Sequence, residues 1–193
     1  MKDNKNELKN LKVQARRKKK KIIDSKWIIK ITLITFFISF VFSFLSETII
    51  PAVNTILGVI LVLLFVFIGI LFDMIGVAVT SANIKPFNSM SSRKVKGAKL
   101  AVKMIKNADK VSSFCNDVIG DICGIISGSA GVIIAVSLSE ALSTNKFIVT
   151  LIVTSLIAAI TIGGKALGKS YAINKNDIIL YRFAKFLSNF IRK

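Results

Sequence analysis

The sequence predicts an all-α membrane protein with four transmembrane helices and amphipathic juxtamembrane helices. Hydrophobic residues make up 53% of the 193 residues, mean hydropathy is +0.65, and the apolar residues lie in long blocks. Such a chain is too apolar for disorder, and its blocks are too long for a soluble core. Because strict alternation of apolar and polar residues is absent, the pattern argues against a membrane β-barrel.

Four blocks have the length that a helix needs to cross a bilayer core of roughly 30 Å, which is about 20 residues. They cover residues 27–46, 55–80, 114–138 and 147–167. Lys30 near the start of the first block can extend its ammonium group to the interface. Asp73 interrupts the second block, Asp117 and Asp121 begin the third, and Lys165 lies near the end of the fourth.

The distribution of lysine and arginine predicts how these spans are oriented. Residues 1–26 hold eleven of them, residues 84–110 hold eight, and six more follow Lys165. The two short connections near residues 47–54 and 139–146 contain one lysine between them. The positive-inside rule therefore predicts a multi-pass cell-membrane protein with both termini and the long middle loop in the cytoplasm.

The formal charge of +18 favours anionic lipid as a partner. Each lysine or arginine near a cytoplasmic membrane surface is attracted by about 1 kcal/mol. Nucleic acid is not expected, since no aromatic platform or folded basic module accompanies the charges. The predicted organisation is a basic cytoplasmic tail over residues 1–26, a transmembrane domain over 27–170 and a C-terminal amphipathic segment over 171–193.

Two segments outside the spans have the periodicity of amphipathic helices. In residues 92–111, lysines recur on one helical face and small or branched apolar residues on another. In residues 176–191, leucine, phenylalanine, alanine and isoleucine form an apolar stripe, and Arg182, Lys185 and the following Arg192 lie away from it. Both segments are predicted to lie in the cytoplasmic interface.

Composition also excludes several kinds of catalytic and metal site. The chain has no histidine and two cysteines, Cys115 and Cys123. It therefore lacks the residues for a Ser-His-Asp triad, a histidine-ligated metal or a four-cysteine zinc site. No enzyme activity is expected.

Charged residues inside the predicted spans are the candidate site. Asp73, Asp117, Asp121 and Lys165 all fall in the cytoplasmic half, and Asp117 and Asp121 share one helical face. Carboxylates beside other oxygen donors suit a hard cation such as Mg²⁺, with Asp73 and Asp121 as the candidate metal ligands. The alternative is a buried ion pair, in which Asp73 and Asp121 are neutralised by Lys165.

Three glycines in the third block are spaced by four residues: Gly120, Gly124 and Gly128. Glycine on one face of a membrane helix lets another backbone approach closely. This face is predicted to serve helix packing, either within the chain or across a homodimer.

Over about residues 65–190 the sequence resembles the transmembrane domain of CNNM/CorB-type magnesium transporters. Residues 72–81 (F-D-M-I-G-V-A-V-T-S) stand where that family has F-S-x-S-E-x-A-L-x-S. Residues 97–104 (G-A-K-L-A-V-K-M) match its basic G-A-x-x-A-x-x-L helix. Gly120-Asp121 takes the place of a G-N pair with a small offset, and residues 164–170 (G-K-A-L-G-K-S) align with G-E-x-x-P-K-S.

The resemblance implies the fold, a homodimer and a role in magnesium or cobalt ion transport or homeostasis. The chain departs from the family at its cation-contacting positions, which are Asp73, Ile75 and Gly76, and it has Lys165 in place of glutamate. It also has an additional first span, and these 193 residues contain no counterpart of the family's CBS pair. Two hypotheses follow: a divalent-cation transporter, or a transport-inactive membrane regulator or assembly partner in which Lys165 replaces the bound cation.

Overall fold

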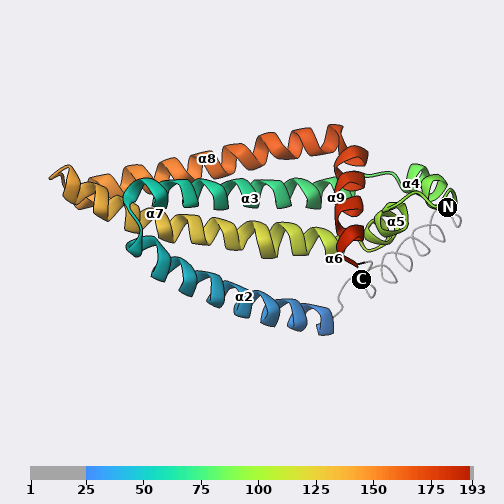
Figure 1. Cartoon of the computed structure of the whole chain (residues 1–193), viewed down its shortest axis with the longest axis horizontal. Coiled ribbons are helices and arrows are strands. Elements are labelled where there is room, and N and C mark those ends of the chain that lie inside the picture. The colour runs from blue at the N-terminus through green and yellow to red at the C-terminus, as the bar shows by residue number, and fades with distance from the viewer. Residues whose placement is uncertain (1–24, 192–193) are drawn as a thin grey trace, which may run out of the picture. The chain divides into compact units, whose positions relative to one another are not determined.

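A computed structural model describes residues 25–191 (Figure 1), and this part of the chain is helical without any strand. Four helices are long and apolar enough to cross a membrane, as predicted. They are α2 (Ser25–Ala52), α3 (Thr55–Ser81), the continuous helix Ala108–Ala141, and α8 (Lys146–Asn174). The protein is an all-α, multi-pass membrane protein, and each span extends past its predicted bounds.

The chain divides into two compact units, residues 1–40 and 41–193. In the first unit the described residues are 25–40, the first part of α2, and the predicted basic tail lies outside them except for its last two residues. Their large side chains are exposed, as Phe36 and Phe40 show at 62% and 64%. Exposed aromatic and aliphatic side chains on a helix of this length are typical of contact with lipid.

In the second unit three long helices lie side by side: α3, α8 and α7 (Asp121–Ala141) (Figure 1). Asn54 begins α3 by accepting a hydrogen bond from the Leu57 amide, and Asn145 begins α8 in the same way with Phe147. These caps satisfy amide groups that the first turn of a helix leaves without partners. α3 buries one narrow face, made of Gly58, Val62, Val66, Gly69, Asp73, Gly76, Ala78 and Val79.

The third span is not a uniform α-helix. It starts with α6 (Ala108–Ser113), continues as the π-helix η1 (Phe114–Gly120) and becomes α7. A π-helix has a wider turn than an α-helix, so it changes the direction in which every later side chain points around the helix axis. Such segments are frequent at functional sites. The candidate residues Asp117 and Asp121 lie within it and directly after it.

The predicted amphipathic helix over residues 92–111 is wrong in its bounds. The structure has α4 (Ile84–Ser92) and α5 (Ala98–Lys106), separated by a turn in which Lys94 and Gly97 have positive φ angles of 56° and 86°. A helix cannot continue through left-handed residues. α5 is nevertheless amphipathic as expected, because Ala98, Ala101 and Met104 are buried.

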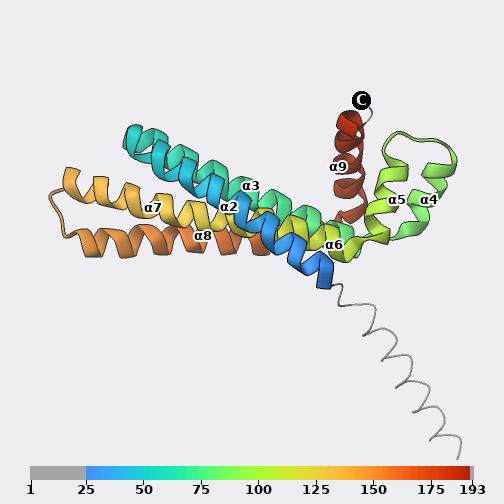
Figure 2. The same cartoon turned by 90° about the horizontal axis from the view of Figure 1, so that it is seen from below.

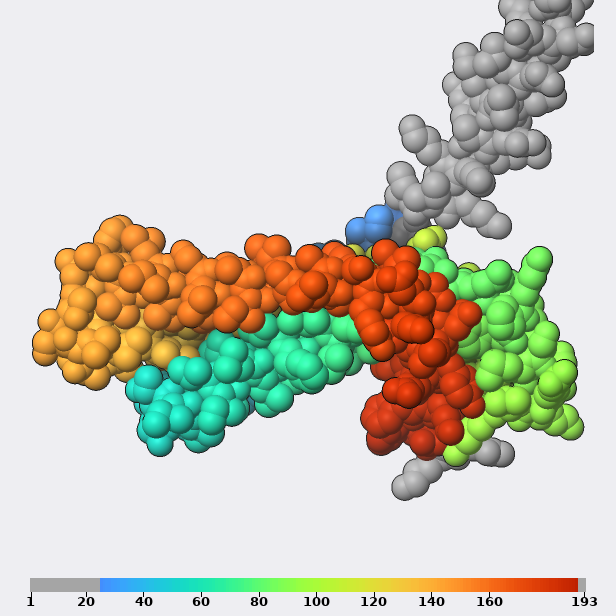
Figure 3. Space-filling model, turned by 90° about the horizontal axis from the view of Figure 1, so that it is seen from above, coloured from blue at the N-terminus to red at the C-terminus, as the bar shows by residue number. Residues whose placement is uncertain are grey.

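The helix predicted over residues 176–191 is confirmed as α9 (Asn176–Ile191). It crosses the end of the bundle at a steep angle to α3 and α8 (Figures 1 and 2) and packs beside α4 and α5 (Figure 3). We call this end of the bundle, where α4, α5 and α9 lie, the basic end. Its core joins all these elements and consists of Val79, Phe87, Ala101, Met104, Leu180 and Ala184.

Candidate functional site

Asp73 is the one charged side chain among the buried residues of the described chain. It lies two turns before the end of α3, on the face that packs against η1 and α8, and only 4% of the side chain is exposed. Its Oδ2 atom accepts no hydrogen bond from the described residues. A buried ionised carboxylate without partners is costly, so the cation beside it determines what this site can do.

The cation that faces Asp73 is Lys169, and the predicted pairing of Asp73 with Lys165 is wrong. The Lys169 Nζ atom lies 3.6 Å from Asp73 Oδ2, and half of the Lys169 side chain is exposed. Lys165 and Lys169 are one turn apart on α8 and share a face. The rotation of α8 about its axis brings the second of the two lysines to α3, which the sequence spacing alone does not determine.

Lys165 binds the start of α7. Its Nζ atom donates to Asp121 Oδ1 at 3.3 Å and to the carbonyl oxygen of Gly120 at 3.4 Å. The predicted Lys165–Asp121 pair is therefore present. It is partly solvated, because 64% of the Asp121 side chain is exposed.

Asp117 does not join either pair. It is exposed on η1 and forms no ion pair within the part of the chain that the structure describes. The described residues contain no group of three or more His, Cys, Asp or Glu side chains that could hold a metal ion. The candidate ligands Asp73 and Asp121 each face a lysine instead.

Asn116 is a site residue that the sequence analysis missed. Its side chain lies against the Cα atom of Gly76, one turn after Asp73 on α3, and its Oδ1 atom is buried without a hydrogen-bond partner. Its Nδ2 atom donates to Ser112 Oγ at 3.3 Å. The signal was present, since Asn116 is an amide inside an apolar block. What brings it to α3 is the π-helix.

Of the three predicted packing glycines, only Gly120 has its Cβ position next to another helix of the described residues. A Cβ atom at Gly120 would lie 3.7 Å from both the Gly69 carbonyl oxygen on α3 and the Lys165 Nζ atom on α8. Cβ atoms at Gly124 and Gly128 would meet nothing within 4 Å in the part of the chain that the structure describes. The prediction that these two glycines allow close packing within the chain is wrong.

The geometry thus places a buried carboxylate, an unpartnered amide oxygen and two lysines together near the basic end. Carboxylate and amide oxygens are ligands for hard cations, and lysine is their competitor. Comparison with known proteins adds no relative, since no family model, curated protein or solved structure matches this chain.

Proposed function

We propose that the protein binds Mg²⁺ as a transported or sensed cation and acts in magnesium or cobalt ion transport or homeostasis. The observation that carries the proposal is two buried oxygens that have no hydrogen-bond partner among the described residues, Asp73 Oδ2 and Asn116 Oδ1. Asp73 lies on α3, and the Asn116 side chain of η1 lies against Gly76, one turn further along α3. The resemblance of residues 65–190 to the CNNM/CorB transmembrane domain gives the same expectation.

In this proposal Lys169 is a tethered competitor of the ion. Its ammonium group neutralises Asp73 at 3.6 Å without forming a hydrogen bond of 3.5 Å or less, and its side chain is half exposed. Lysine carries its charge on a flexible stem, so it can leave for water when another cation arrives. Mg²⁺ keeps several of its waters and needs only one or two carboxylates, which suits a site with few protein ligands.

Addition of millimolar Mg²⁺ should stabilise the purified full-length protein against heat. A ligand at ten times its Kd contributes about 1.4 kcal/mol, which corresponds to roughly 3–5 °C for a chain of this size. Lys169→Met should strengthen the response at low Mg²⁺ concentrations, because it removes the competing charge. The measurement is the melting temperature in neutral detergent as a function of Mg²⁺ concentration.

Asp117→Asn is the matched control for this titration. It removes one carboxylate that is exposed and has no ion pair with the described residues, so the Mg²⁺ response should be unchanged. Asp73→Asn should abolish the response. An equal Mg²⁺ response in the Asp73→Asn protein would refute the proposed site.

A transport-inactive regulator or assembly partner is the second candidate function. It is favoured by Lys165, whose ammonium group is held by both Asp121 and the Gly120 carbonyl oxygen. A fixed positive charge raises the energy of cation entry, by several kcal/mol where the effective dielectric is low. Proteoliposomes that take up no more Mg²⁺ than empty ones, although Mg²⁺ stabilises the protein, would select this candidate.

We further propose that the basic end faces the cytoplasm of a cell-membrane protein. A cysteine at Asn189 on α9 should be protected from an impermeant thiol reagent in intact cells, whereas one at Thr144 between α7 and α8 should react. Both positions are exposed, and the native Cys115 and Cys123 are buried. Both probes should react after permeabilisation. Reaction at Asn189 alone in intact cells would reverse the orientation.

Gly124 and Gly128 are the face that we propose for a homodimer, since a Cβ atom at either position would meet no other described residue within 4 Å. Close approach of a second copy is what glycine permits on a membrane helix. A partner membrane protein on the same face would serve the regulator function equally well.

A further inference from the structure

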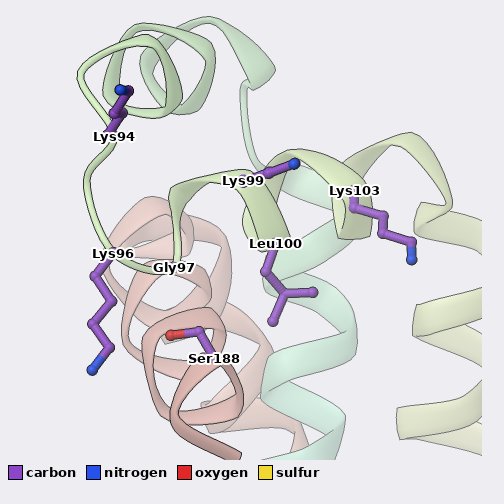
Figure 4. Close-up of a pocket in the computed structure, with 7 residues that line it drawn as sticks. All are labelled: Lys94, Lys96, Gly97, Lys99, Leu100, Lys103 and Ser188. Atoms are coloured by element: carbon purple, nitrogen blue, oxygen red, sulfur yellow. The ribbon is translucent and has the colours of Figure 1, made fainter. Parts of the chain in front are cut away.

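A pocket of about 460 Å³ lies at the basic end between the α4–α5 turn, α5 and α9. We call it the lysine pocket. Figure 4 shows the residues that line it, which are Lys94, Lys96, Gly97, Lys99, Leu100, Lys103 and Ser188. None of them belongs to the pairs around Asp73 and Asp121.

The lysine pocket carries concentrated positive charge. Four of its lining residues are lysines and none is acidic. None of the four forms an ion pair with a described residue. Residues 84–110 contain eight lysines and arginines and one acid, Asp109. Like charges at such density repel one another, so an anion in the pocket is favoured.

The backbone of the turn determines the form of the pocket. Gly97 has a φ of 86°, and a Cβ atom on it would lie 2.8 Å from the Cα atom of Lys185. The turn therefore lies directly on the α9 backbone, and Ser188 follows one turn later on α9. The α4–α5 turn and α9 therefore pack against each other at the wall of the cavity.

The arrangement of the ammonium groups suits a membrane surface better than a small free anion. In Figure 4 the groups of Lys96, Lys99 and Lys103 point in different directions around the pocket. A single phosphate is held by converging donors, whereas an anionic bilayer offers several phosphates spread over an area.

Exposed apolar side chains on α5 and α9 also support contact with a membrane surface. Leu100 lines the pocket, and Phe186 and Phe190 on α9 are 60% and 70% exposed with ring centroids 5.0 Å apart. Lysines combined with exposed aromatic rings are typical of a helix at the bilayer interface. The lysine ammonium groups can reach the headgroups while the rings enter the acyl region.

We propose that the lysine pocket binds anionic phospholipid of the adjoining leaflet, with one headgroup in the cavity and neighbouring headgroup phosphates beside the lysines that point away from it. This inference is independent of cation binding at Asp73, because the two sites share no residue. The lipid would anchor α5 against α9.

The test is the affinity of the full-length protein in neutral detergent for phosphatidylglycerol, measured by native mass spectrometry against phosphatidylcholine. The pocket variant combines Lys94→Gln, Lys96→Gln, Lys99→Gln and Lys103→Gln. We expect its Kd for phosphatidylglycerol to rise at least tenfold, which corresponds to about 1.4 kcal/mol. Phosphatidylcholine binding should be unchanged. All four side chains are exposed, and an unchanged melting temperature checks the fold.

Two matched variants separate a pocket from diffuse surface charge. The first combines Lys85→Gln, Lys106→Gln, Lys146→Gln and Lys175→Gln, which removes the same charge from exposed positions outside the pocket lining. Its Kd should rise less than threefold. The second, Ser188→Tyr, fills the pocket and keeps every lysine, and it should weaken phosphatidylglycerol binding at least threefold.

Three results would overturn the proposal. Equal weakening in the two lysine variants would show that only total charge matters. Unchanged binding in Ser188→Tyr would show that no headgroup enters the cavity. Displacement of phosphatidylglycerol by millimolar inorganic phosphate would identify a free phosphate, and not a lipid, as the ligand.

Discussion

Gly97→Ala should destabilise the protein by about 2–3 kcal/mol and lower its melting temperature by roughly 5–10 °C. The left-handed φ of 86° disfavours any residue with a Cβ atom. In addition, the new Cβ atom would meet backbone atoms of Lys185 at 2.8 and 2.9 Å. Backbone atoms cannot turn aside as a side chain can, so α5 and α9 must separate.

Hydrogen exchange offers a local measurement of the same effect. Amides of α9 should exchange faster in the Gly97→Ala protein, because the contact that holds α9 to the turn is weakened. Gly163→Ala on α8 is the control. A Cβ atom at Gly163 would meet no side chain or other helix of the described residues within 4 Å, and alanine is the better helix former by about 1 kcal/mol. Equal melting temperatures for Gly97→Ala and the unmodified protein would contradict the close contact.

The four spans could be predicted from the sequence because a bilayer imposes one simple requirement. Each crossing needs about 20 apolar residues in a helix. The first, third and fourth observed spans run longer at both ends, whereas α3 begins at Thr55 as predicted. α8 reaches Asn174 although the apolar block ends near Leu167. Outside the hydrocarbon core, polar residues such as Lys169 and Ser170 continue a helix as readily as apolar ones, so hydropathy does not mark the end.

The partners within the site could not be predicted, because they depend on helix rotation. Residues 165 and 169 differ by about 40° around α8, since a helix turns by roughly 100° per residue. Spacing shows that both lysines share a face. It does not show that Lys165 meets Asp121 while Lys169 meets Asp73.

The π-helix had a similar effect on Asn116. One widened turn at η1 places Asn116 against Gly76 and leaves Gly120 at the end of the π segment. Each four-residue step in α7 leaves an offset of about 40° around the helix, so Gly124 and Gly128 point progressively away from the neighbours of Gly120. No residue pattern within 114–120 predicts the wider turn.

Removal of the Lys169 charge should cost more stability than removal of the Asp73 charge. Lys169→Ala leaves a carboxylate that is only 4% exposed without its cation. We expect a loss of about 2 kcal/mol, below the 3–5 kcal/mol typical of a fully buried pair because water already reaches half of the lysine. Asp73→Asn leaves a half-exposed ammonium group that water can solvate, and we expect a loss of about 1 kcal/mol.

The double variant Asp73→Asn/Lys169→Ala should lose less stability than the two single losses added together. We expect a coupling free energy of about 1 kcal/mol or more between the two changes. Melting temperatures are compared in EDTA, so that no Mg²⁺ replaces the missing lysine. The control cycle combines Lys169→Ala with Asp117→Asn, and its effects should add, because Asp117 has no ion pair with the described residues. Additive effects in the Asp73 cycle would contradict the ion pair between Asp73 and Lys169. An equal coupling free energy in both cycles would show that the coupling comes from net charge and not from this pair. A coupling confined to Asp73 means that the cation position beside this carboxylate is already filled by the chain itself, so any Mg²⁺ that binds there must displace Lys169.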